Sequence, residues 1–368
     1  MGATNQDVQQ RNAIARANNG ASSFFEDCDF SIAFDIDGVL QRGKEVLAHS
    51  KEVIELLHSL NVPFILLTNG GGKTERAHAE RVSERLGVTI EEDQFIQSHT
   101  PFKSLVAAHK GHFVLVLGGH EDQIRDLAVA YGFDHDSILT DSDLLLHFPH
   151  LAAFAEISES YHAKFGRFNP KFAQDPAIHG VFVFSSPRDW YLDLQICVDL
   201  LLSKQGRLGT RSSKNGNTSL EFNGFYKDGQ PMIHFCNPDV QWATSHPQPR
   251  LAQGAFMAAL EGIWRDVTKG QAPFNIWSCG KPTARTYQFA ETAIQARHRK
   301  QYPGSQTVVR RAYMIGDNPE SDVRGAYLAN QHHACQIAWS SVLVETGVYQ
   351  PRALEMLDPA PTAIRRNV

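Results

Sequence analysis

Apolar runs and helical patterns alternate along the chain in an order that predicts an α/β protein. Phe30–Phe34 is a short apolar run that ends in the polar stretch Asp35–Gly38, as a buried strand does where it meets a functional loop. A helical pattern follows, then a second apolar run at Val62–Leu67, a glycine-rich loop, and a charged helix over Thr74–Leu86. This order predicts parallel strands joined by right-handed crossovers.

The same pattern starts again beyond residue 100 and returns to the first sheet near the C-terminus. The later strands are expected at Phe113–Leu117, Val181–Phe184, Met232–Phe235, Ala312–Ile315 and Ala334–Trp339, and the later helices at Glu121–Tyr131, Trp190–Leu202, Leu251–Lys269 and Ala284–Lys300. We therefore predict a Rossmann-like, doubly wound parallel sheet as a core, interrupted by an inserted α/β body, the cap. The expected boundaries are an N-terminal extension at 1–26, a core at 27–100 and 251–368, and a cap at 101–250.

The composition limits which classes of binding partner and which cellular locations are expected for this protein. The 35 Lys+Arg and 40 Asp+Glu give a formal charge of −5, so there is no electrostatic footprint for nucleic acid, and a small-molecule substrate is expected. No apolar run approaches the roughly 18 residues of a membrane span, so no span is expected. Five scattered cysteines without a C-x-x-C pair and a polar N-terminus predict an intracellular protein, cytoplasmic or mitochondrial. Whether the N-terminus is a mitochondrial presequence stays open.

Acidic residues follow two of the predicted core strands. Asp35 and Asp37 follow the first strand, Asp317 follows a later one, and Asp322 comes five residues after it. The carboxyl ends of parallel strands share one edge of a sheet, so these side chains are expected to meet there. Close carboxylates repel one another unless a cation neutralises them, and Mg²⁺ prefers oxygen ligands. The four aspartates are therefore the candidate magnesium ligands, whereas no Cys/His pattern points to zinc.

The same edge offers groups for phosphoryl transfer. A carboxylate can attack phosphorus to form an aspartyl-phosphate, and Asp35 is the candidate nucleophile, with Asp37 as general acid and base. The Thr68 hydroxyl and the backbone N–H groups of Asn69 and Gly70 are candidate phosphate donors.

Lys281, in a tight turn just ahead of a helix, is the candidate fixed cation for the phosphate. Each of these residues also has a simpler interpretation. Thr68 could be an ordinary helix-capping residue, Lys281 a solvated turn lysine, and Asp322 a residue that stabilises a helix N-terminus.

Four short motifs, in order, carry a resemblance to a known family. Asp35–Val39, Leu67–Asn69, Gly280–Pro282 and Gly316–Asp322 resemble the four motifs of the haloacid dehalogenase superfamily of phosphohydrolases, and the resemblance extends from about residue 30 to 347. The insert resembles the large α/β cap of the second type found in subfamily IIA. The glycine-rich stretch Gly70–Thr74 resembles the eukaryotic hydrolases related to the cat eye syndrome critical region protein.

The resemblance implies a role for each matching residue. Asp35 would be the nucleophile and would bind the metal with Asp317 and the main-chain carbonyl of Asp37, whose side chain would be the acid/base. Thr68 and Lys281 would bind phosphate. Asp322 would be an outer or alternate metal ligand, and a homodimer through the cap is an open option.

The expected function is a Mg²⁺-dependent phosphatase acting on a small phosphorylated metabolite through an aspartyl-phosphate at Asp35. Three alternatives stay open at this point. The chain could be a mutase that passes the phosphoryl group to another acceptor, a catalytically weak protein that binds a phosphorylated ligand or a protein partner, or a dehalogenase. The Asp35/Asp37 pair disfavours the last, because Asp37 has a role only when a leaving oxygen must be protonated.

Overall fold

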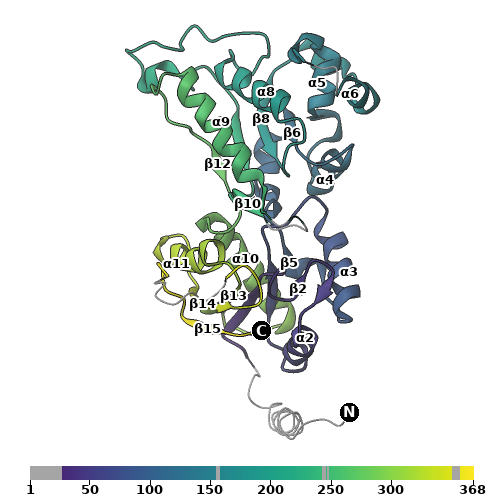
Figure 1. Ribbon diagram of the computed structural model, residues 1–368, viewed down its shortest axis with the longest axis vertical. Coiled ribbons are helices and arrows are strands. Elements are labelled where there is room, and N and C mark those ends of the chain that lie inside the picture. The colour runs from purple at the N-terminus through teal and green to yellow at the C-terminus, as the bar shows by residue number, and fades with distance from the viewer. Residues whose placement is uncertain (1–26, 155–157, 243–245, 247, 350–356) are drawn as a thin grey trace, which may run out of the picture. The chain divides into compact units, whose positions relative to one another are not determined.

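A six-stranded parallel sheet forms the centre of the first of two units into which the chain divides (Figure 1). The computed structural model describes residues 27–154, 158–242, 246, 248–349 and 357–368, so the predicted extension at 1–26 lies outside the described residues. The first unit contains the described residues up to Thr68, Glu75–Ile96 and those from Tyr287 on, and the second contains Asn69–Thr74 and Gln97–Thr286.

The sheet of the first unit has the strand order β15-β14-β13-β1-β4-β5, and each neighbouring pair is parallel. Its strands are β1 (Phe30–Phe34), β4 (Phe64–Leu67), β5 (Phe95–Ile96), β13 (Arg311–Gly316), β14 (Ala338–Val344) and β15 (Ala363–Arg365). The accompanying elements are the hairpin β2 (Gln41–Arg42) and β3 (Glu45–Val46), helices α2 (Ser50–Ser59), α3 (Glu75–Leu86), α10 (Ala284–Gln301) and α11 (Arg324–Gln331), the 3₁₀ turn η2 (Glu92–Gln94) and the π-helical turn η7 (Pro319–Val323).

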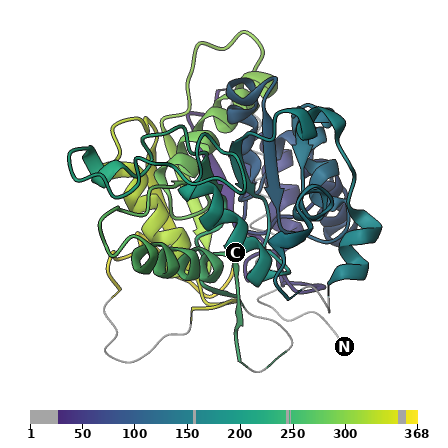
Figure 2. The ribbon, with the colours of Figure 1, turned by 90° about the horizontal axis from the view of Figure 1, so that it is seen from above.

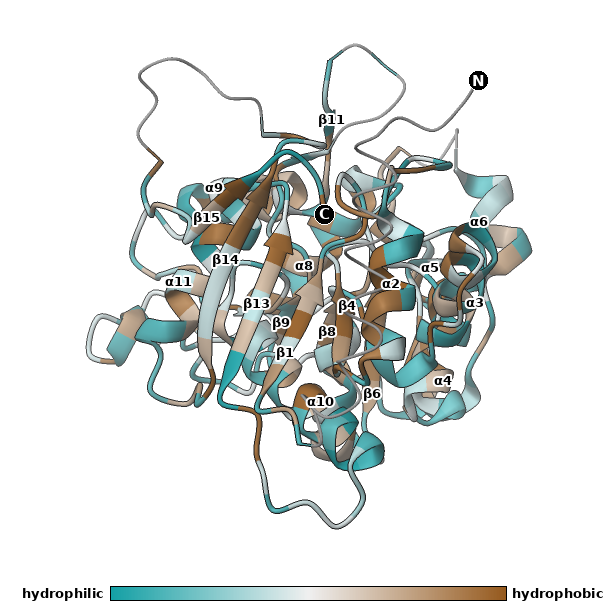
Figure 3. Cartoon of the chain, turned by 90° about the horizontal axis from the view of Figure 1, so that it is seen from below, coloured by the Kyte–Doolittle hydropathy of each residue, from teal (hydrophilic) through white to brown (hydrophobic). Residues whose placement is uncertain are grey.

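Helices cover both faces of this sheet because its central strands are apolar on both sides. Successive side chains of a strand point to opposite faces. Phe34 packs in one cluster with residues of α2 and α3, whereas Ala33 packs in another with residues of α10 and α11. The hydrophobic residues of β1 and β4 are brown in Figure 3. The predicted doubly wound α/β fold is therefore confirmed.

The strand order fixes where a ligand can bind in the first unit. From β1 the chain moves outward through β4 to β5, and it later returns to β13, which pairs with β1 on the other side. Open α/β sheets bind ligands beyond the carboxyl ends of the strands at such a change of direction, which in this sheet lies between β1 and β13. Asp35 and Asp317 are the first residues after these two strands.

The second unit contains a five-stranded parallel sheet of order β12-β9-β8-β6-β7. Its strands are β6 (Phe113–Leu117), β7 (Ile138–Leu139), β8 (Ile178–Val183), β9 (Met232–Phe235) and β12 (Trp277–Ser278), and a separate hairpin joins β10 (Gln241–Trp242) and β11 (Arg250–Leu251). Its helices are α4 (Gln123–Tyr131), α5 (Asp141–His147), α6 (Glu159–Phe165), α7 (Pro170–Gln174), α8 (Trp190–Leu202) and α9 (Gln253–Val267), with 3₁₀ segments η3 (Thr100–His109), η4 (His135–Ser137), η5 (Pro149–Leu151) and η6 (Glu221–Gly224).

The structure places the second boundary between cap and core later in the chain than the sequence analysis did. The sequence analysis assigned residues 251–368 to the core, but α9 and β12 belong to the second unit. Phe256 and Trp264 of α9 are buried in the same cluster as residues of α8 and β9, and β12 pairs with β9. The helical period of α9 shows that one face is buried, but not which sheet it is buried against.

A second correction concerns the strand expected at Ala334–Trp339. The strand runs instead over β14, Ala338–Val344, and the residues after α11 form a turn in which the Cys335 N–H donates to the His332 carbonyl at 3.0 Å. Hydrogen bonding in this turn keeps its residues out of the ladder, so an apolar composition alone misplaced the start of the strand.

Residues 203–231 contain little regular structure and are traced in teal to green in Figure 2. Among the residues that the structure describes, no helix combines the length and apolarity needed to cross a bilayer.

Two buried histidines of the second unit predict a pH-dependent stability. Burial lowers the pKa of His99 to about 3 and that of His234 to about 4, and the side chains are 0% and 4% exposed. The Gly72 N–H donates to His99 Nε2 at 2.9 Å, so Nε2 carries no proton, and Nδ1 then donates to the Tyr131 hydroxyl at 2.6 Å. Protonation would break the bond to Gly72.

The unfolded chain binds a proton at each histidine below about pH 6.5, whereas the folded chain does not until about pH 4 or 3. The free energy of unfolding should therefore fall as the pH falls from 6.5, by up to about 1.4 kcal/mol per pH unit for each histidine. Urea titrations across this range should show a shallower fall in His99→Gln, measured against its own value at pH 8. An unchanged slope would contradict the assignment of His99 as neutral.

Candidate functional site

Asp35 and Asp317 occupy matching positions at the ends of two neighbouring strands. The Asp35 N–H donates to the Ile315 carbonyl at 2.8 Å and so extends the β1–β13 ladder by one residue. Asp35 is 9% exposed and Asp317 is 3% exposed. The register of the two strands therefore places both residues at the switch in strand order.

Asp322 reaches the same place from the π-helical turn η7. Asn318 begins this turn, and its side chain accepts the N–H of Glu320 at 3.0 Å, which is a common way to cap a helical turn. The Asp322 carboxylate accepts the N–H of Asn318 at 3.1 Å, and the residue is 1% exposed. Asp322 thus supports the turn that follows β13 as well as facing the site.

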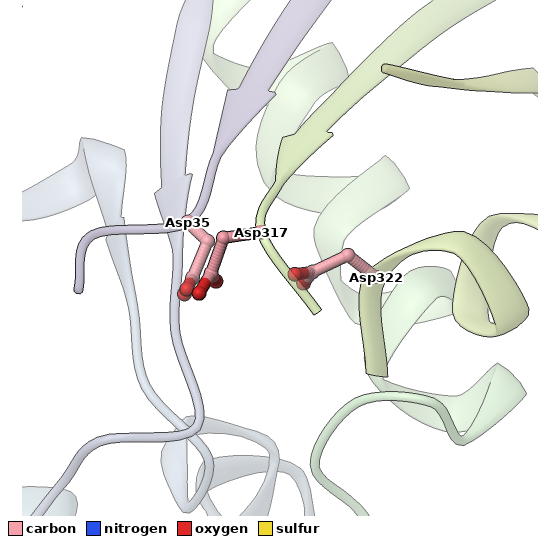
Figure 4. A group of neighbouring side chains, drawn as sticks. All are labelled: Asp35, Asp317 and Asp322. Atoms are coloured by element: carbon pink, nitrogen blue, oxygen red, sulfur yellow. The ribbon is translucent and has the colours of Figure 1, made fainter. Parts of the chain in front are cut away.

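The three carboxylates form one group. One oxygen each of Asp35, Asp317 and Asp322 lies within 4.8 Å of the others. Figure 4 shows the carboxylates of Asp35 and Asp317 side by side, with Asp322 pointing toward them from η7. Three buried negative charges this close are costly without a cation. Carboxylate oxygens on separate elements are the ligands that Mg²⁺ prefers, so the group fits this ion.

Three glycines allow the backbone to pack directly against these carboxylates. A Cβ atom on Gly38 or Gly347 would lie 2.4 or 1.8 Å from Asp317 Oδ2, and one on Gly316 would lie 2.2 Å from Asp322 Oδ2. The Val348 N–H donates to Asp317 Oδ2 at 2.6 Å. Gly347 and its neighbour were not among the sequence-predicted site residues. A glycine so far along the chain gives no local signal of this contact.

Asp37 stands apart from the carboxylate group. Its side chain is not among the three carboxylates of the group. Its Oδ1 accepts a hydrogen bond from Gln41 Nε2 at 3.1 Å, and Arg85 donates to the Gln41 side-chain oxygen at 3.1 Å. Asp37 is exposed as a whole residue, but its carboxyl group is partly shielded from water, which raises its pKa; the Asp35 charge also raises this pKa, and the Gln41 bond opposes the rise. A raised pKa suits a group that donates a proton.

Thr68 lies at the same edge of the first sheet. It follows β4, which pairs with β1 so that Leu66 lies opposite Phe34. The Thr68 N–H donates to the Ile96 carbonyl at 3.0 Å, and the residue is 7% exposed. The position after β4 is consistent with a phosphate contact and does not require the capping role considered from the sequence.

The remaining predicted phosphate binders, Asn69, Gly70 and Lys281, belong to the second unit. The Asn69 side chain accepts the Lys281 N–H at 2.7 Å and donates to the Lys281 carbonyl at 2.8 Å. Asn69 also donates to Asp239 Oδ2 at 3.1 Å, and the Asn237 side chain donates to the Asn69 carbonyl at 3.1 Å.

Asn69 therefore ties the turn of Lys281 to the loop that follows Thr68, and any phosphate contact of Asn69 falls to its backbone N–H. Lys281 is 1% exposed, unlike a solvated turn lysine. The sequence analysis did not link Asn237 and Asp239 to Asn69, because these hydrogen bonds join residues about 170 positions apart.

Two family models match separate stretches of the chain, and both stretches include residues of each unit. Residues 32–134 match the model of the haloacid dehalogenase-like hydrolases, and residues 278–368 match a second, HAD-hydrolase-like model. The first match contains Asp35, Asp37 and Thr68, and the second contains Lys281 and Asp317.

Two curated relatives are similar over nearly the whole chain. A mitochondrial hydrolase of Saccharomyces cerevisiae is 34% identical over 92% of this chain and 93% of the relative. A cardiolipin synthase (CMP-forming)/mitochondrial hydrolase fusion protein of Schizosaccharomyces pombe is 37% identical over 88% of this chain. The chain spans only about half of that fusion protein, 49% of its length.

A solved structure shares the fold at low identity. The 4-nitrophenylphosphatase of Thermotoga maritima aligns over 93% of this chain and 95% of its own, with a TM-score of 0.56 and 17% identity. At this identity the likeness concerns the fold.

Proposed function

Because the chain belongs to the haloacid dehalogenase-like hydrolases, we propose that it is a phosphatase that releases inorganic phosphate from a small phosphorylated metabolite, with Asp35 as nucleophile. The observation that carries the proposal is the meeting of Asp35 and Asp317 at the switch in strand order, with Asp322 within 4.8 Å. The names of the two curated relatives, both hydrolases, and of the 4-nitrophenylphosphatase support it.

The proposed reaction has two steps on the side chains of Asp35 and Asp37. An Asp35 carboxylate oxygen attacks phosphorus, a bond from that oxygen to phosphorus forms, and the ester P–O bond breaks. Asp37 gives its proton to the leaving oxygen, which departs as an alcohol. Asp37 then takes a proton from water while the water oxygen bonds to phosphorus and the Asp35–phosphorus bond breaks. Phosphate leaves, and both carboxylates return to their starting state.

The proposed metal ligands are Asp35, Asp317 and the carbonyl of Asp37, with Asp322 beside them as a supporting or alternate ligand. A magnesium ion held there would neutralise the carboxylates and the phosphate, which would otherwise repel the attacking group. Thr68, the backbone N–H groups of Asn69 and Gly70, and the Lys281 ammonium are proposed to bind the phosphoryl oxygens. The second unit is proposed to be the cap.

The relatives also guide the proposed location and the substrates to test. Both are named as mitochondrial hydrolases, and we propose a mitochondrial location for this chain. One of them is fused to a cardiolipin synthase. Substrates with a phosphorylated glycerol headgroup should therefore be tested together with phosphorylated sugars and nucleotides. A homodimer through the cap stays a prediction.

Metal removal tests the proposal. Phosphorylated sugars, nucleotides and glycerol headgroups would first be compared to find the most active substrate. Dialysis against a chelator should lower phosphate release from that substrate more than about a hundredfold, because the carboxylates are left without a counter-ion. Added Mg²⁺ should restore the rate, whereas Ca²⁺, which takes longer bonds and more ligands, should not. Phosphate release at full rate in the presence of the chelator would contradict the proposal.

A further inference from the structure

Gln41 is a buried residue of the first unit that the turn after β1 places next to Asp37. It is 5% exposed, and residues 37 and 41 form an isolated β-bridge. The Gln41 N–H donates to the Ile36 carbonyl at 3.0 Å, and the Gln41 carbonyl accepts the Gly38 N–H at 2.7 Å. These backbone bonds close a tight turn, so the Gln41 side chain has a fixed position beside the carboxyl group of Asp37.

The Gln41 side chain lies between Asp37 and Arg85 of α3. Its Nε2 donates to Asp37 Oδ1 at 3.1 Å, and Arg85 Nη1 donates to its Oε1 at 3.1 Å. A guanidinium group can only donate hydrogen bonds, so the amide oxygen must face Arg85 and the NH2 group must face Asp37. Arg85 therefore determines which end of the amide meets the carboxyl group.

Arg85 bonds to the hairpin rather than to an acidic residue. Its Nη1 also donates to the Gly43 carbonyl at 3.1 Å, in the turn between β2 and β3. Across the ranges that the structure describes, no carboxylate forms an ion pair with Arg85, whereas Arg76 of the same helix pairs with Glu92. Both hydrogen bonds of Arg85 thus go to neutral acceptors in the segment that holds Asp37.

A neutral donor suits a carboxyl group that must gain and lose a proton. Oδ1 of Asp37 can accept the Gln41 bond in either protonation state, so this bond persists while a proton moves at Oδ2. A guanidinium bound directly to the carboxyl group would instead favour the ionised form and oppose proton donation. With Gln41 between them, Arg85 can fix the orientation of Asp37 without bonding to it.

We infer that Gln41 is a positioning residue for Asp37, and that Arg85 acts through Gln41 by fixing the orientation of its amide. The inference rests on the proposed function, in which Asp37 is the general acid and base. Oδ2 of Asp37 gives its proton to the leaving oxygen as the ester P–O bond breaks, and the same atom takes a proton from water in the second step. Misplacing a catalytic group by about 1 Å can cost about a hundredfold in rate.

The basicity of the leaving oxygen distinguishes positioning of Asp37 from a purely structural role. Benzyl, phenyl and 4-nitrophenyl phosphate carry rings of similar size, and the basicity of the leaving oxygen falls in that order. The kcat/KM of each ester covers the steps up to departure of the leaving group. A basic oxygen needs the proton of Asp37, whereas 4-nitrophenolate can leave without one.

Gln41→Met keeps the length of the side chain but removes its hydrogen bonds to Asp37 and Arg85. It should lower kcat/KM about tenfold with benzyl phosphate and less than about twofold with 4-nitrophenyl phosphate, with phenyl phosphate between them. Gln41→Glu keeps the shape and the acceptor for Arg85, but its ionised carboxylate has no donor for Asp37. The difference between the esters should be at least as large in this variant.

Variants of Arg85 test whether it acts through Gln41. Arg85→Met should show a smaller difference between the esters, because the amide of Gln41 can then turn. Arg85→Lys should restore part of the rate with benzyl phosphate, because an ammonium can donate to Gln41 Oε1. The matched controls are Gln288→Met, at an exposed position of α10, and Arg76→Met on α3, and both should keep the wild-type rates with all three esters.

The outcomes separate the inference from the proposed function. Folded Gln41 variants that lose kcat/KM equally with all three esters, or do not lose it, overturn the inference and leave the proposed function standing. Arg85 is half-buried, so Arg85→Met decides by the same criterion if thermal melts show that the Gln41 variants do not fold. No Asp35-dependent release from these esters or from phosphorylated sugars, nucleotides and glycerol headgroups overturns the proposed function and the inference with it.

Discussion

Asp35→Asn is expected to lower phosphate release more than about a thousandfold while leaving the fold intact. Asparagine has the shape of aspartate but lacks the anionic oxygen that attacks phosphorus. The backbone N–H of residue 35 can still donate to the Ile315 carbonyl, so the β1–β13 ladder is kept. Steady-state release of phosphate, with circular dichroism and a thermal melt on the same preparations, measures both effects.

The matched control for this variant is Asp266→Asn. The Asp266 side chain is 87% exposed and forms an ion pair with Lys269, which lies in the turn after α9. This variant should retain the wild-type rate. Equal rates in Asp35→Asn and the wild type would exclude Asp35 as the nucleophile, whatever the effect of metal removal.

Asp317→Asn is expected to separate metal binding from folding. The Asp317 carboxylate lies beside that of Asp35 and accepts the Val348 N–H at 2.6 Å, a bond that the asparagine oxygen can also accept. Removing one of three clustered negative charges should weaken Mg²⁺ binding and lower the rate at a fixed, low Mg²⁺ concentration about a hundredfold. Higher Mg²⁺ should recover part of the rate.

Thermal melts give a readout of Asp317→Asn that does not depend on activity. Without metal, the variant should be as stable as the wild type or more stable, by on the order of 1 kcal/mol, because a like-charge repulsion is removed. A hundredfold excess of Mg²⁺ over its dissociation constant should stabilise the wild type by about 2.7 kcal/mol, and the same concentration should stabilise the variant much less. An equal Mg²⁺-induced shift in both proteins would exclude Asp317 as a ligand.

The sequence predicted helices and strands best where the hydrophobic periodicity and the residues at the ends of the segment indicated the same element. β1, β6, β9 and α8 have the predicted bounds, and the apolar run or helical period of β1, β6 and α8 ends at a clear polar or glycine boundary. The doubly wound order also followed from the strand-helix rhythm. Asp35 and Asp317 were expected to meet, because both follow parallel strands, and their carboxylates do.

Contacts that depend on tertiary packing could not be predicted from the sequence. The helical period of α9 is the same whichever sheet buries it, so its place in the second unit was missed. Gly347 and Val348 enclose the Asp317 carboxylate from about 30 residues further along the chain, and Gln41 with Arg85 holds Asp37 from a hairpin and a helix. Such contacts depend on how elements pack, and single residues carry no periodic signal of them.

The most direct test of the account is to look for the phosphoryl group on Asp35 itself. Wild-type protein with Mg²⁺ and a rapidly turned-over ester, quenched in acid within the first turnover, should yield a phosphorylated peptide that contains Asp35, and hydroxylamine should release the label as it does from an acyl phosphate. Phosphate release in the first turnover with no label on protein, or with label on a different residue, would contradict the account.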